Sequence, residues 1–338
     1  MHRPRAVVVA ERTAWVLDDA WPEYASMIAA RFAPGDQLVA PGVRGAWPSR
    51  YAWPLPVRHA APLATIRRHV AMRRVAHAAG DVRQRAYLAH DRALAHELAR
   101  AIDYRARHLV VAQAWLPWLD EAGALGGRSF DVLMSRYPLG AIHRLLDGAA
   151  RALGASRSIA DFRADSGLVA REAELLARAR TVITPHHGIA ALFADKAVRL
   201  AWHRPPPAPR RPGTRTAFLG PTIARERPDV ARALAAALPG PLIVFGPIIE
   251  PAWQGIAIER RAFGPGWLDE IGTILHPATF TNQPRRLLEA LASGVTVRAT
   301  AECGLDPADF APLAGALAER PIEELDAVCA REPRLAAF

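Results

Sequence analysis

The stretch HPATFTNQPRRLLEALASGVTVRAT, from His276 to Thr300, decides the fold prediction. It starts where a short apolar strand ends in His-Pro, and it ends in a second apolar strand, Val295–Thr300. Between the two strands, Pro284–Ser293 has helical spacing. Proline suits a first helical turn, where its missing N–H would have no partner, and Gly294 suits the position after a helix end. A strand, a helix and a strand in this order predict two parallel strands of one sheet.

The same alternation of short apolar runs and amphipathic helices fills the rest of the chain. It is interrupted by HRPPPAPRRPGT, His203–Thr214, whose prolines favour an extended, semi-rigid linker. We therefore predict an α/β protein with two Rossmann-like domains that face a cleft. The first spans residues 1–203, the linker 204–214 and the second domain 215–315, while 316–338 form a helix or tail, for which a return to the first domain is one path.

The strands expected before the linker are Ala6–Ala10, Gln37–Ala40, His108–Gln113, Ser129–Ser135, Thr181–Pro185 and Ala197–Trp202, and the helices are Pro22–Phe32, most of Ala64–Arg107, Gly140–Leu153 and Gly167–Ala179. After it, the strands are Thr216–Gly220, Leu242–Gly246, Ile258–Phe263, Thr273–Pro277 and Val295–Thr300, and the helices are Pro228–Leu238, Trp267–Ile271, Pro284–Ser293 and Ile322–Arg331. Fully apolar strands separated by helices indicate parallel sheets covered on both faces, which bind ligands beyond the carboxyl ends of their strands.

The composition is that of a soluble globular protein. The 338 residues are 51% hydrophobic and 22% charged, and no segment approaches the roughly 20 apolar residues of a membrane-spanning helix. The apolar run near the N-terminus ends at Glu11 and is too short for a signal peptide. The two cysteines, Cys303 and Cys329, indicate no disulfide framework and fit a reducing compartment. We therefore expect a cytoplasmic protein, with peripheral contact with the inner face of the membrane left open.

The net charge of +10 permits an anionic partner without requiring one. Lys196 is the only lysine, so 42 of the 43 basic residues are arginine, a bias that a GC-rich genome produces by codon usage alone. Arginine nevertheless binds phosphate through a bidentate fork. The arginines do not cluster with aromatic residues on a recognisable nucleic-acid-binding module, which argues against nucleic acid as the partner.

Strands ending in FLG and LIVFG, followed by GPGWLDEIGTILHPATFTNQPRRLLEALASGVTVRAT, carry a family resemblance over Thr216–Thr300. This part resembles the C-terminal domain of GT-B glycosyltransferases. It is most similar to the retaining group with a strand ending in His-Pro, then Glu-x7-Glu, then Ala-x-Gly-x-Pro-Val. In the first part only the strand order and REAELLARARTVITPHHGIAALFAD match, where such enzymes pass from the acceptor domain to the donor domain. The resemblance implies a nucleotide-sugar co-substrate, with UDP- or GDP-sugar favoured, and no metal in catalysis.

The resemblance implies specific roles around the predicted helix. Glu289 stands at the second glutamate of the motif, which accepts hydrogen bonds from the donor ribose; a solvated helix residue is the alternative. Thr281 replaces the first glutamate, which contacts the transferred sugar. A different donor sugar, a different stereochemical course or an inactive relative would each explain this departure. From the residues alone, Thr281, Asn282 and Gln283 precede a helix start, where free N–H groups favour a diphosphate.

Two loops of the second domain complete the expected donor site. Arg225 and Arg227, in GPTIARERPD, stand where the family neutralises the donor diphosphate, although Pro221 replaces the usual arginine. A solvated loop is the alternative. Gly264, in Gly-Pro-Gly, would let the backbone approach the nucleotide base, or would only form a turn.

The loop AERTAWVLDDAWPEY, after the first expected strand, contains no glycine. It places Glu11, Arg12, Asp18 and Asp19 at the end of that strand that faces the cleft, although Asp19 could equally cap the helix that begins near Pro22.

Other polar residues of the first domain end later strands. Gln113, and the pair Ser135 and Arg136, are expected to reach the acceptor. His186 and His187 open a helix after TVITP, where they would act as a general base or as a phosphate contact. A purely structural role for both histidines is the alternative.

A basic amphipathic stretch lies in the first domain, with Arg67, Arg68, Arg73 and Arg74 interleaved with Leu63, Ile66, Val70 and Val75. Family members that act on lipid-linked acceptors use similar surfaces to contact anionic membranes. A solvated helix face is the alternative. No metal site is predicted, because no Cys-x2-Cys or His-Glu-x-x-His spacing occurs.

Two functions follow. The first is a glycosyltransferase that moves a sugar from a nucleotide-sugar to a surface polysaccharide, a lipid-linked glycan, a protein or a small metabolite. In a retaining enzyme of this fold the departing phosphate assists the incoming hydroxyl, which suits a chain with no evident catalytic dyad. The alternative is a catalytically inactive GT-B module that acts as a binding or partner subunit, which Thr281 favours.

Overall fold

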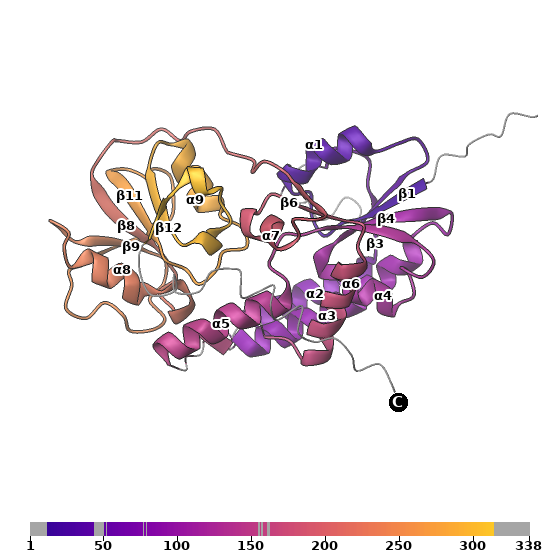
Figure 1. Ribbon diagram of the computed structural model, residues 1–338, viewed down its shortest axis with the longest axis horizontal. Helices are drawn as coiled ribbons and strands as arrows, with labels where there is room; N and C mark the ends of the chain where they lie inside the picture. Colours follow the sequence, from indigo (N-terminus) through magenta and orange to yellow (C-terminus); the bar gives the residue numbers. More distant parts are fainter. Residues whose placement is uncertain are drawn as a thin grey trace, which may run out of the picture.

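The computed structural model describes residues 12–43, 51, 53–76, 78, 80–154, 156, 158–160 and 163–313. They form two α/β domains that lie side by side (Figure 1), each built on one parallel sheet. This confirms the predicted fold class. The expected strand Ala6–Ala10, Glu11, Cys329 and the expected helix Ile322–Arg331 lie outside the described residues.

The first domain contains a seven-stranded sheet in the order β3-β2-β1-β4-β5-β6-β7, with every pair parallel. Its strands are β1 (Arg12–Val16), β2 (Gln37–Pro41), β3 (Arg58–Ala60), β4 (Ala106–Ala112), β5 (Ser129–Leu133), β6 (Thr181–Thr184) and β7 (Ala197–Arg199). The sequence pattern predicts β2 and β4 to β7. It does not predict β3, and it is wrong about β1, whose residues it assigns to a loop. The polar start of β1 hides a strand whose later residues, such as Trp15 and Val16, are buried in the sheet.

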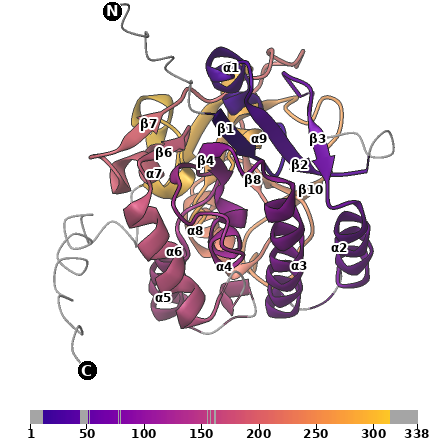
Figure 2. The ribbon, with the colours of Figure 1, turned by 90° about the vertical axis from the view of Figure 1, so that its right-hand side faces the viewer.

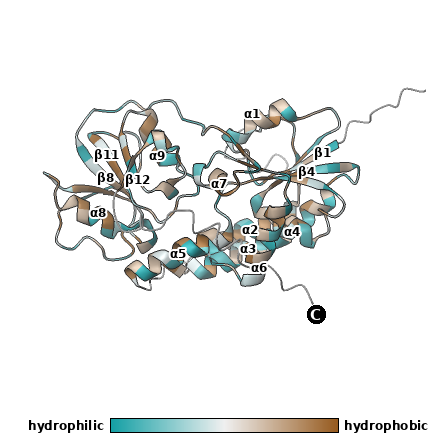
Figure 3. Ribbon diagram, viewed as in Figure 1, coloured by the Kyte–Doolittle hydropathy of each residue, from teal (hydrophilic) through white to brown (hydrophobic). Residues whose placement is uncertain are grey.

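Helices cover both faces of the first sheet. They are α1 (Pro22–Arg31), α2 (Pro62–Arg74), α3 (Gly80–Ala101), α4 (Leu116–Glu121), α5 (Leu139–Leu153), α6 (Ser166–Arg178) and α7 (His187–Leu192). On one face, Tyr24 and Ile28 of α1 pack against Val110. On the other face, α3 to α6 pack against Leu109 and Val111. Hydrophobic and hydrophilic residues alternate along α5 in Figure 3, as expected of a helix that covers a sheet. The helical spacing predicted over most of Ala64–Arg107 corresponds to two helices, α2 and α3, that pack against each other.

The second domain repeats this plan on a six-stranded sheet in the order β10-β9-β8-β11-β12-β13. Its elements are β8 (Arg215–Leu219), α8 (Pro228–Ala235), β9 (Leu242–Phe245), β10 (Ile258–Arg261), β11 (Ile271–His276), α9 (Arg285–Ala292), β12 (Thr296–Ala299) and β13 (Ala311–Pro312). The helix predicted at Trp267–Ile271 is wrong. Gly266 has a φ of +71°, which favours a turn, and Ile271 already belongs to β11.

The connection between the sheets has no regular secondary structure over residues 200–214. It packs on the second domain, where Nε of Arg210 donates to the carbonyl of Ser293 at 2.7 Å and Nη1 donates to that of Ile271 at 3.0 Å. Among the described residues, no helix is both long and apolar enough to span a bilayer.

Candidate functional site

The candidate site lies where the strand order of the second sheet reverses. β8 and β11 are neighbours, but the sheet continues from β8 toward β9 and from β11 toward β12. Open parallel sheets bind ligands beyond the carboxyl ends of their strands at such a point. The loop after β8 contains Arg225 and Arg227, and the loop after β11 contains Thr281, Asn282 and Gln283. The fold therefore brings two groups of predicted site residues to one edge of the sheet.

Thr281 is held by three hydrogen bonds. Its hydroxyl lies 2.6 Å from Nε2 of His276, its N–H donates to the carbonyl of Glu302, and its own carbonyl accepts from Nε2 of His186. Burial, with a smaller effect of the Arg225 charge, lowers the pKa of His276 to about 4. The His276 imidazole is therefore neutral at pH 7, and it fixes a threonine that is still partly exposed.

The two predicted diphosphate ligands have different environments. The guanidinium of Arg225 lies 5.6 Å from the centre of the Phe280 ring, so it reaches the loop between β11 and α9, while Nη2 donates to Glu226 at 2.8 Å. Arg227 is 2% exposed, and its Nε and Nη2 both donate to the carboxylate of Asp229. Arg225 thus lies beside the loop between β11 and α9 and is paired with the buried Glu226, whereas Arg227 is itself buried and pairs with the partly exposed Asp229 at the start of α8.

Glu289 and the Gly264 turn are joined by one hydrogen bond. Oε1 of Glu289 accepts from Nε1 of Trp267 at 2.8 Å, and Oε2 accepts from Nη1 of Arg286 at 2.8 Å. A carboxylate has about four lone-pair positions, so each oxygen can accept a further hydrogen bond. The Glu289 side chain is 27% exposed, and a Cβ built on Gly264 would meet no atom within 4 Å. Ligand can therefore reach both groups.

Aromatic rings gather beside Glu289. The rings of Phe245 and Phe263 are stacked with centres 4.8 Å apart, and Trp267 meets both edge-on. The Arg286 guanidinium lies 4.6 Å from the Phe263 centre. Phe245 and Trp267 are buried, so the members of this cluster that a planar ligand could contact are the partly exposed Phe263 and the exposed Arg286.

His186 is the N-cap of α7 and is fully buried. Its Nδ1 accepts from the N–H of Ile189, so the ring proton is assigned to Nε2, which donates to the carbonyl of Thr281 at 3.0 Å. Burial lowers the pKa of His186 to about 4. Because both ring nitrogens are occupied and the ring is neutral, this histidine is suited to positioning Thr281 rather than to accepting a proton.

Gly304 packs directly against the His186 ring. A Cβ at Gly304 would lie 2.5 Å from Nε2 of His186, and the φ of Gly304 is +82°. Its carbonyl accepts from the N–H of His187 at 3.0 Å and from Nε1 of Trp202 at 2.9 Å. His187 meanwhile accepts from Arg199 through Nδ1. Only a glycine allows this close approach between α7 and the second domain.

The loop between β11 and α9 also enters the first domain. Phe280 is 3% exposed and belongs to the hydrophobic core on the α3 to α6 side of the first sheet. Oδ1 of Asn282 accepts from the N–H of Tyr137 at 3.2 Å, and the carbonyl of Gln283 accepts from the N–H of Arg285. Both neighbours of Thr281 are therefore anchored to the first domain.

A buried ion pair joins the two domains on the α1 side. Both Nη atoms of Arg285 donate to the carboxylate of Glu23, whose side chain is 1% exposed. The Arg285 guanidinium is also surrounded by three aromatic rings, with centres 5.6 Å (Trp21), 5.9 Å (Tyr51) and 5.7 Å (Trp202) away. Arg285 thus connects the start of α9 to α1.

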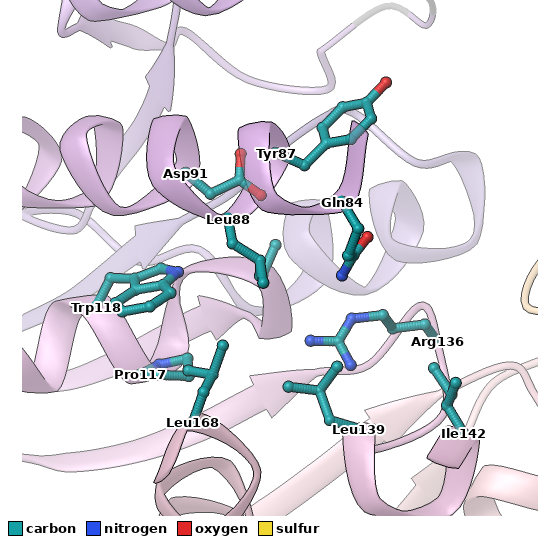
Figure 4. A pocket seen from close by; sticks show the side chains of 11 residues that line it. Gln84, Tyr87, Leu88, Asp91, Pro117, Trp118, Arg136, Leu139, Ile142 and Leu168 are labelled. Atoms are coloured by element: carbon teal, nitrogen blue, oxygen red, sulfur yellow. The ribbon is translucent and has the colours of Figure 1, made fainter. Parts of the chain in front are cut away.

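The first domain has an open pocket of ≈ 230 Å³ beyond the carboxyl ends of β4 and β5. Its apolar lining includes Leu88, Trp118 and Ile142. Gln84 and Arg136 also line it, and Figure 4 shows the Arg136 side chain extending into the space between α3 and Leu139. Tyr137 follows Arg136, and its N–H donates to Asn282. The pocket therefore lies close to the loop that contains Thr281.

Arg136 is oriented by a buried carboxylate. Its Nη2 donates to Glu172 at 2.7 Å, and Glu172, 1% exposed, also accepts from the side chain of Gln113 and from the N–H of Leu139. The prediction that Gln113 and Arg136 reach the acceptor remains untested; the structure shows them in one polar network, with Arg136 lining the pocket.

The residues around β1 differ from the prediction. Arg12 begins β1 instead of following it, so it lies at the opposite edge of the sheet. Asp19 accepts from the N–H of Ala20, and no side chain caps α1, so the predicted cap is wrong. Asp18 accepts from Nε1 of Trp21 at 3.2 Å, and burial raises its pKa to about 6. Because the folded chain binds this proton more tightly than the unfolded chain, Asp18 makes the fold less stable as pH rises from about 4 to about 6.

In the part of the chain that the structure describes, no group of three His, Cys, Asp or Glu side chains could hold a metal ion. No protein-family model matches the chain, and no curated protein matches it in sequence.

Solved structures match the fold. Sucrose-phosphate synthase from Thermosynechococcus elongatus is 11% identical, with a TM-score of 0.50 over 95% of this chain and 90% of that one. The chain has the GT-B fold. The apo form of the lipopolysaccharide outer core galactosyltransferase WaaB is 12% identical, with a TM-score of 0.48 over 95% and 89% of the two chains. HepE of Anabaena in complex with UDP-glucose is 11% identical, with a TM-score of 0.45 over 95% and 90%. At these identities the likeness shows the fold alone.

The sequence pattern does not reveal several residues around the candidate site. It indicates His276 only as the end of a strand, and it gives no signal for Phe280, for Gly304 or for the pair of Glu23 with Arg285. Phe280, Gly304 and the Glu23–Arg285 pair depend on contacts between distant parts of the chain, so no local spacing indicates them. His276 differs, because a histidine at the carboxyl end of a strand beside a switch point is a candidate site residue from its position alone.

Proposed function

We propose that this chain is a glycosyltransferase that moves a sugar from a nucleoside-diphosphate sugar to a hydroxyl group held by the first domain. The observation that carries the proposal is a GT-B fold in which Glu289 is hydrogen-bonded to Trp267 of the Gly264 turn, and in which Arg225 lies against Phe280 in the loop after β11. Glu289, the Gly264 turn and Arg225 come from different loops and from α9, and the family resemblance assigns to them the ribose, the base and the diphosphate.

Glu289 binds the ribose in this proposal. Its two oxygens each keep acceptor capacity after pairing with Trp267 and Arg286, and two adjacent hydroxyls need two acceptor positions. The open space at Gly264 and the partly exposed Phe263 with its stacked Arg286 would take the planar base. UDP- and GDP-sugars are the proposed donors.

Arg225 stabilises the diphosphate as its bond to the sugar breaks. A fixed cation beside developing negative charge is the usual dominant contribution to such chemistry. Thr281 to Gln283 would contact the transferred sugar and the phosphate. Arg227 and His187 are left out of this site, because each is engaged in an interaction away from it.

The proton of the incoming hydroxyl goes to the departing phosphate in this proposal. The bond between the donor oxygen and the sugar carbon breaks with its electrons on the phosphate, and the acceptor oxygen bonds to that carbon. His186 and His276 are buried, neutral and hydrogen-bonded, so neither is assigned as a base. His186 instead positions Thr281.

The acceptor site is proposed to be the pocket beside Arg136. Typical small-molecule sites measure about 300–1,000 Å³, so ≈ 230 Å³ takes one ring-sized group rather than a long chain. Its apolar wall and its arginine suit a group with one apolar face and one polar edge.

An inactive GT-B partner subunit is the second candidate. One observation favours it: the Thr281 hydroxyl, at the position of the missing glutamate, is already bonded to His276. In that case the donor site would bind nucleotide without breaking the sugar bond.

Thermal unfolding with UDP, GDP, CMP, dTDP and their sugar conjugates tests the donor site. A ligand at 100 times its Kd adds about 2.7 kcal/mol of stability. One nucleotide should raise the Tm of the wild type and of Glu174→Ala, whose side chain is exposed on α6, but not that of Glu289→Ala. If no nucleotide does so, the proposed donor site is wrong.

Slow release of free nucleotide from the bound sugar conjugate separates the two candidates, because water can replace an unknown acceptor. Release above the uncatalysed rate supports the transferase. Tight binding with no release supports the inactive subunit.

A further inference from the structure

One carboxylate of the second domain joins the loop that contains Arg225 to the first domain. Oε2 of Glu250 accepts from the N–H of Ala224 at 2.6 Å, and Oε1 accepts from the N–H of Ser158 at 3.3 Å. Oγ of Ser158 in turn accepts from the N–H of Arg225 at 3.4 Å. The backbone of the arginine proposed to bind the diphosphate is therefore held by residues of both domains.

Glu250 is itself fixed in the second domain. It lies in the loop after β9, where its N–H and that of Ile249 donate to the carbonyl of Thr222 at 3.1 and 3.2 Å. The Thr222 hydroxyl accepts from Nε1 of the buried Trp253 at 3.0 Å. Because these bonds tie the loop after β9 to the loop after β8, the Glu250 carboxylate meets Ala224 from a fixed position.

Ser158 provides the first-domain side of this contact. It is 5% exposed and begins the short helix η2 (Ser158–Ala160) between α5 and α6, two helices that lie side by side below the first sheet (Figure 2). Both α5 and η2 contact η3 (Ala224–Glu226), and Ala224 packs against the hydrophobic core of the first domain. The loop after β8 therefore rests on the first domain as well as on its own sheet.

The carbonyl of Arg225 is bonded to the other loop of the site. It accepts from the N–H of Thr279 at 2.9 Å, two residues before Thr281, and the guanidinium lies beside Phe280. Both polar backbone groups of Arg225 are thus engaged, the N–H with Ser158 and the carbonyl with the loop between β11 and α9. A cation held in place in this way can stabilise developing negative charge without rearranging during the reaction.

We propose that Glu250 is a positioning residue for the donor diphosphate and that it acts through Arg225. Its carboxylate fixes Ala224 and Ser158, and through them the backbone of Arg225, so that the guanidinium stays where the diphosphate binds. A carboxylate would repel a diphosphate, so Glu250 contributes through these hydrogen bonds rather than through a contact with the donor. The inference rests on the proposed function, because it requires Arg225 to bind the diphosphate.

Calorimetric titration of the full chain tests the inference with two pairs of nucleotides, UDP with UMP and GDP with GMP. For the pair that binds the wild type, Glu250→Ala should weaken binding of the diphosphate about 5- to 10-fold and of the monophosphate less than about twofold. A displaced arginine keeps part of its attraction, so this loss is smaller than that expected for Arg225→Gln. Glu250→Gln keeps one acceptor oxygen and should weaken diphosphate binding only about 2- to 3-fold.

A double variant shows whether Glu250 acts through Arg225. In the Arg225→Gln background, Glu250→Ala should cause no further loss of diphosphate affinity, because the group that it positions is gone. Glu259→Ala is the matched control, since Glu259 pairs with Arg215 and Arg261, and Arg215 begins β8 at the end opposite to the Arg225 loop. The control should lower the Tm and leave the ratio of diphosphate to monophosphate affinity unchanged.

Four outcomes would overturn the inference. Wild-type diphosphate affinity in Glu250→Ala would mean that the carboxylate only joins the two domains. Equal losses for the diphosphate and the monophosphate would mean general damage to the site. A further loss in the Arg225→Gln background would mean that Glu250 acts independently of Arg225. If neither pair binds the wild type, the proposed donor site is wrong and the inference falls with it.

Thermal unfolding without ligand shows which variants are folded at the temperature of the titration. If Glu250→Ala is unfolded there, Glu250→Gln takes its place in the same comparisons, including the one in the Arg225→Gln background. Wild-type diphosphate affinity in Glu250→Gln would then overturn the inference.

Discussion

The Glu23–Arg285 pair should be the most sensitive point of the domain interface. Arg285→Met would remove the guanidinium and leave a carboxylate that is 1% exposed, with the N–H of His203 at 3.1 Å as its remaining described hydrogen bond. Glu23→Gln would keep the shape of the side chain and remove its charge. Both changes act at the contact between α1 and the start of α9.

The size of the effect follows from burial. Removing one partner of a buried ion pair costs about 3–5 kcal/mol, and Arg285 is 21% exposed, which places its loss near the lower end, about 3 kcal/mol. The three aromatic contacts of Arg285 add about 0.5–1 kcal/mol each at such sites, part of which a methionine would keep by packing. Glu23→Gln should cost less, about 2 kcal/mol, because it still accepts a hydrogen bond.

A double-mutant cycle measured by urea unfolding checks this reasoning. If the pair interacts as described, the double variant should be about 2 kcal/mol more stable than the sum of the single losses predicts. Arg85→Met is the control, because its pair with Asp81 is 69% and 45% exposed and should contribute about 0.5 kcal/mol or less. Additive losses in the Glu23–Arg285 cycle, or an Arg285 loss no larger than that of Arg85, would refute the argument.

Three further predictions concern the site. His186 and His276 have pKa values of about 4 in the folded chain and about 6.5 in the unfolded chain, so each lowers the free energy of unfolding by up to about 3 kcal/mol as pH falls from 6.5 to 4. Urea unfolding across this range should show a smaller loss of stability for His276→Asn than for the wild type. An equal dependence of stability on pH in the two proteins would contradict this prediction. Arg225→Gln should weaken nucleotide-diphosphate binding about 10- to 100-fold in calorimetry, whereas Arg227→Gln should leave the affinity unchanged; both should lower stability, because each removes the partner of a carboxylate, Glu226 or Asp229, and the reverse pattern of affinities would exchange their assignments. Leu88→Trp should fill the first-domain pocket and abolish sugar transfer to an acceptor while nucleotide release to water continues, and transfer at the wild-type rate would exclude the pocket as the acceptor site.

Strands with continuous apolar runs could be predicted from the sequence, and β9 (LIVF) and the LVVA run of β4 are examples. β1 could not, because the run AVVVA nearby gives a stronger local signal than RTAWV, and only pairing with β2 and β4 makes the latter a strand. Trp267–Ile271 has a helical pattern but forms a turn, because Gly266 has a positive φ that the spacing of apolar residues does not report.

The candidate site was predictable in part for the same reason. A resemblance in local sequence predicts roles for Arg225 and Glu289, and these stay predictions; the fold places Arg225 in the loop after β8 and Glu289 on α9, the helix that follows β11. It could not separate Arg225 from Arg227, because the distinction depends on Asp229 and on burial. Nor could it find Glu23, whose partner Arg285 lies 262 residues away.

Gly304 has a mechanical consequence. The His186 ring lies so close to its backbone that one added carbon would sit 2.5 Å from Nε2. Gly304→Ala would therefore insert one methyl group between α7 and the second domain, and it would also strain a backbone with a φ of +82°. The added methyl group would push Thr281 away from α7 without altering a side chain assigned to donor or acceptor. The close approach of α7 to the second domain at this point therefore depends on a residue that has no side chain.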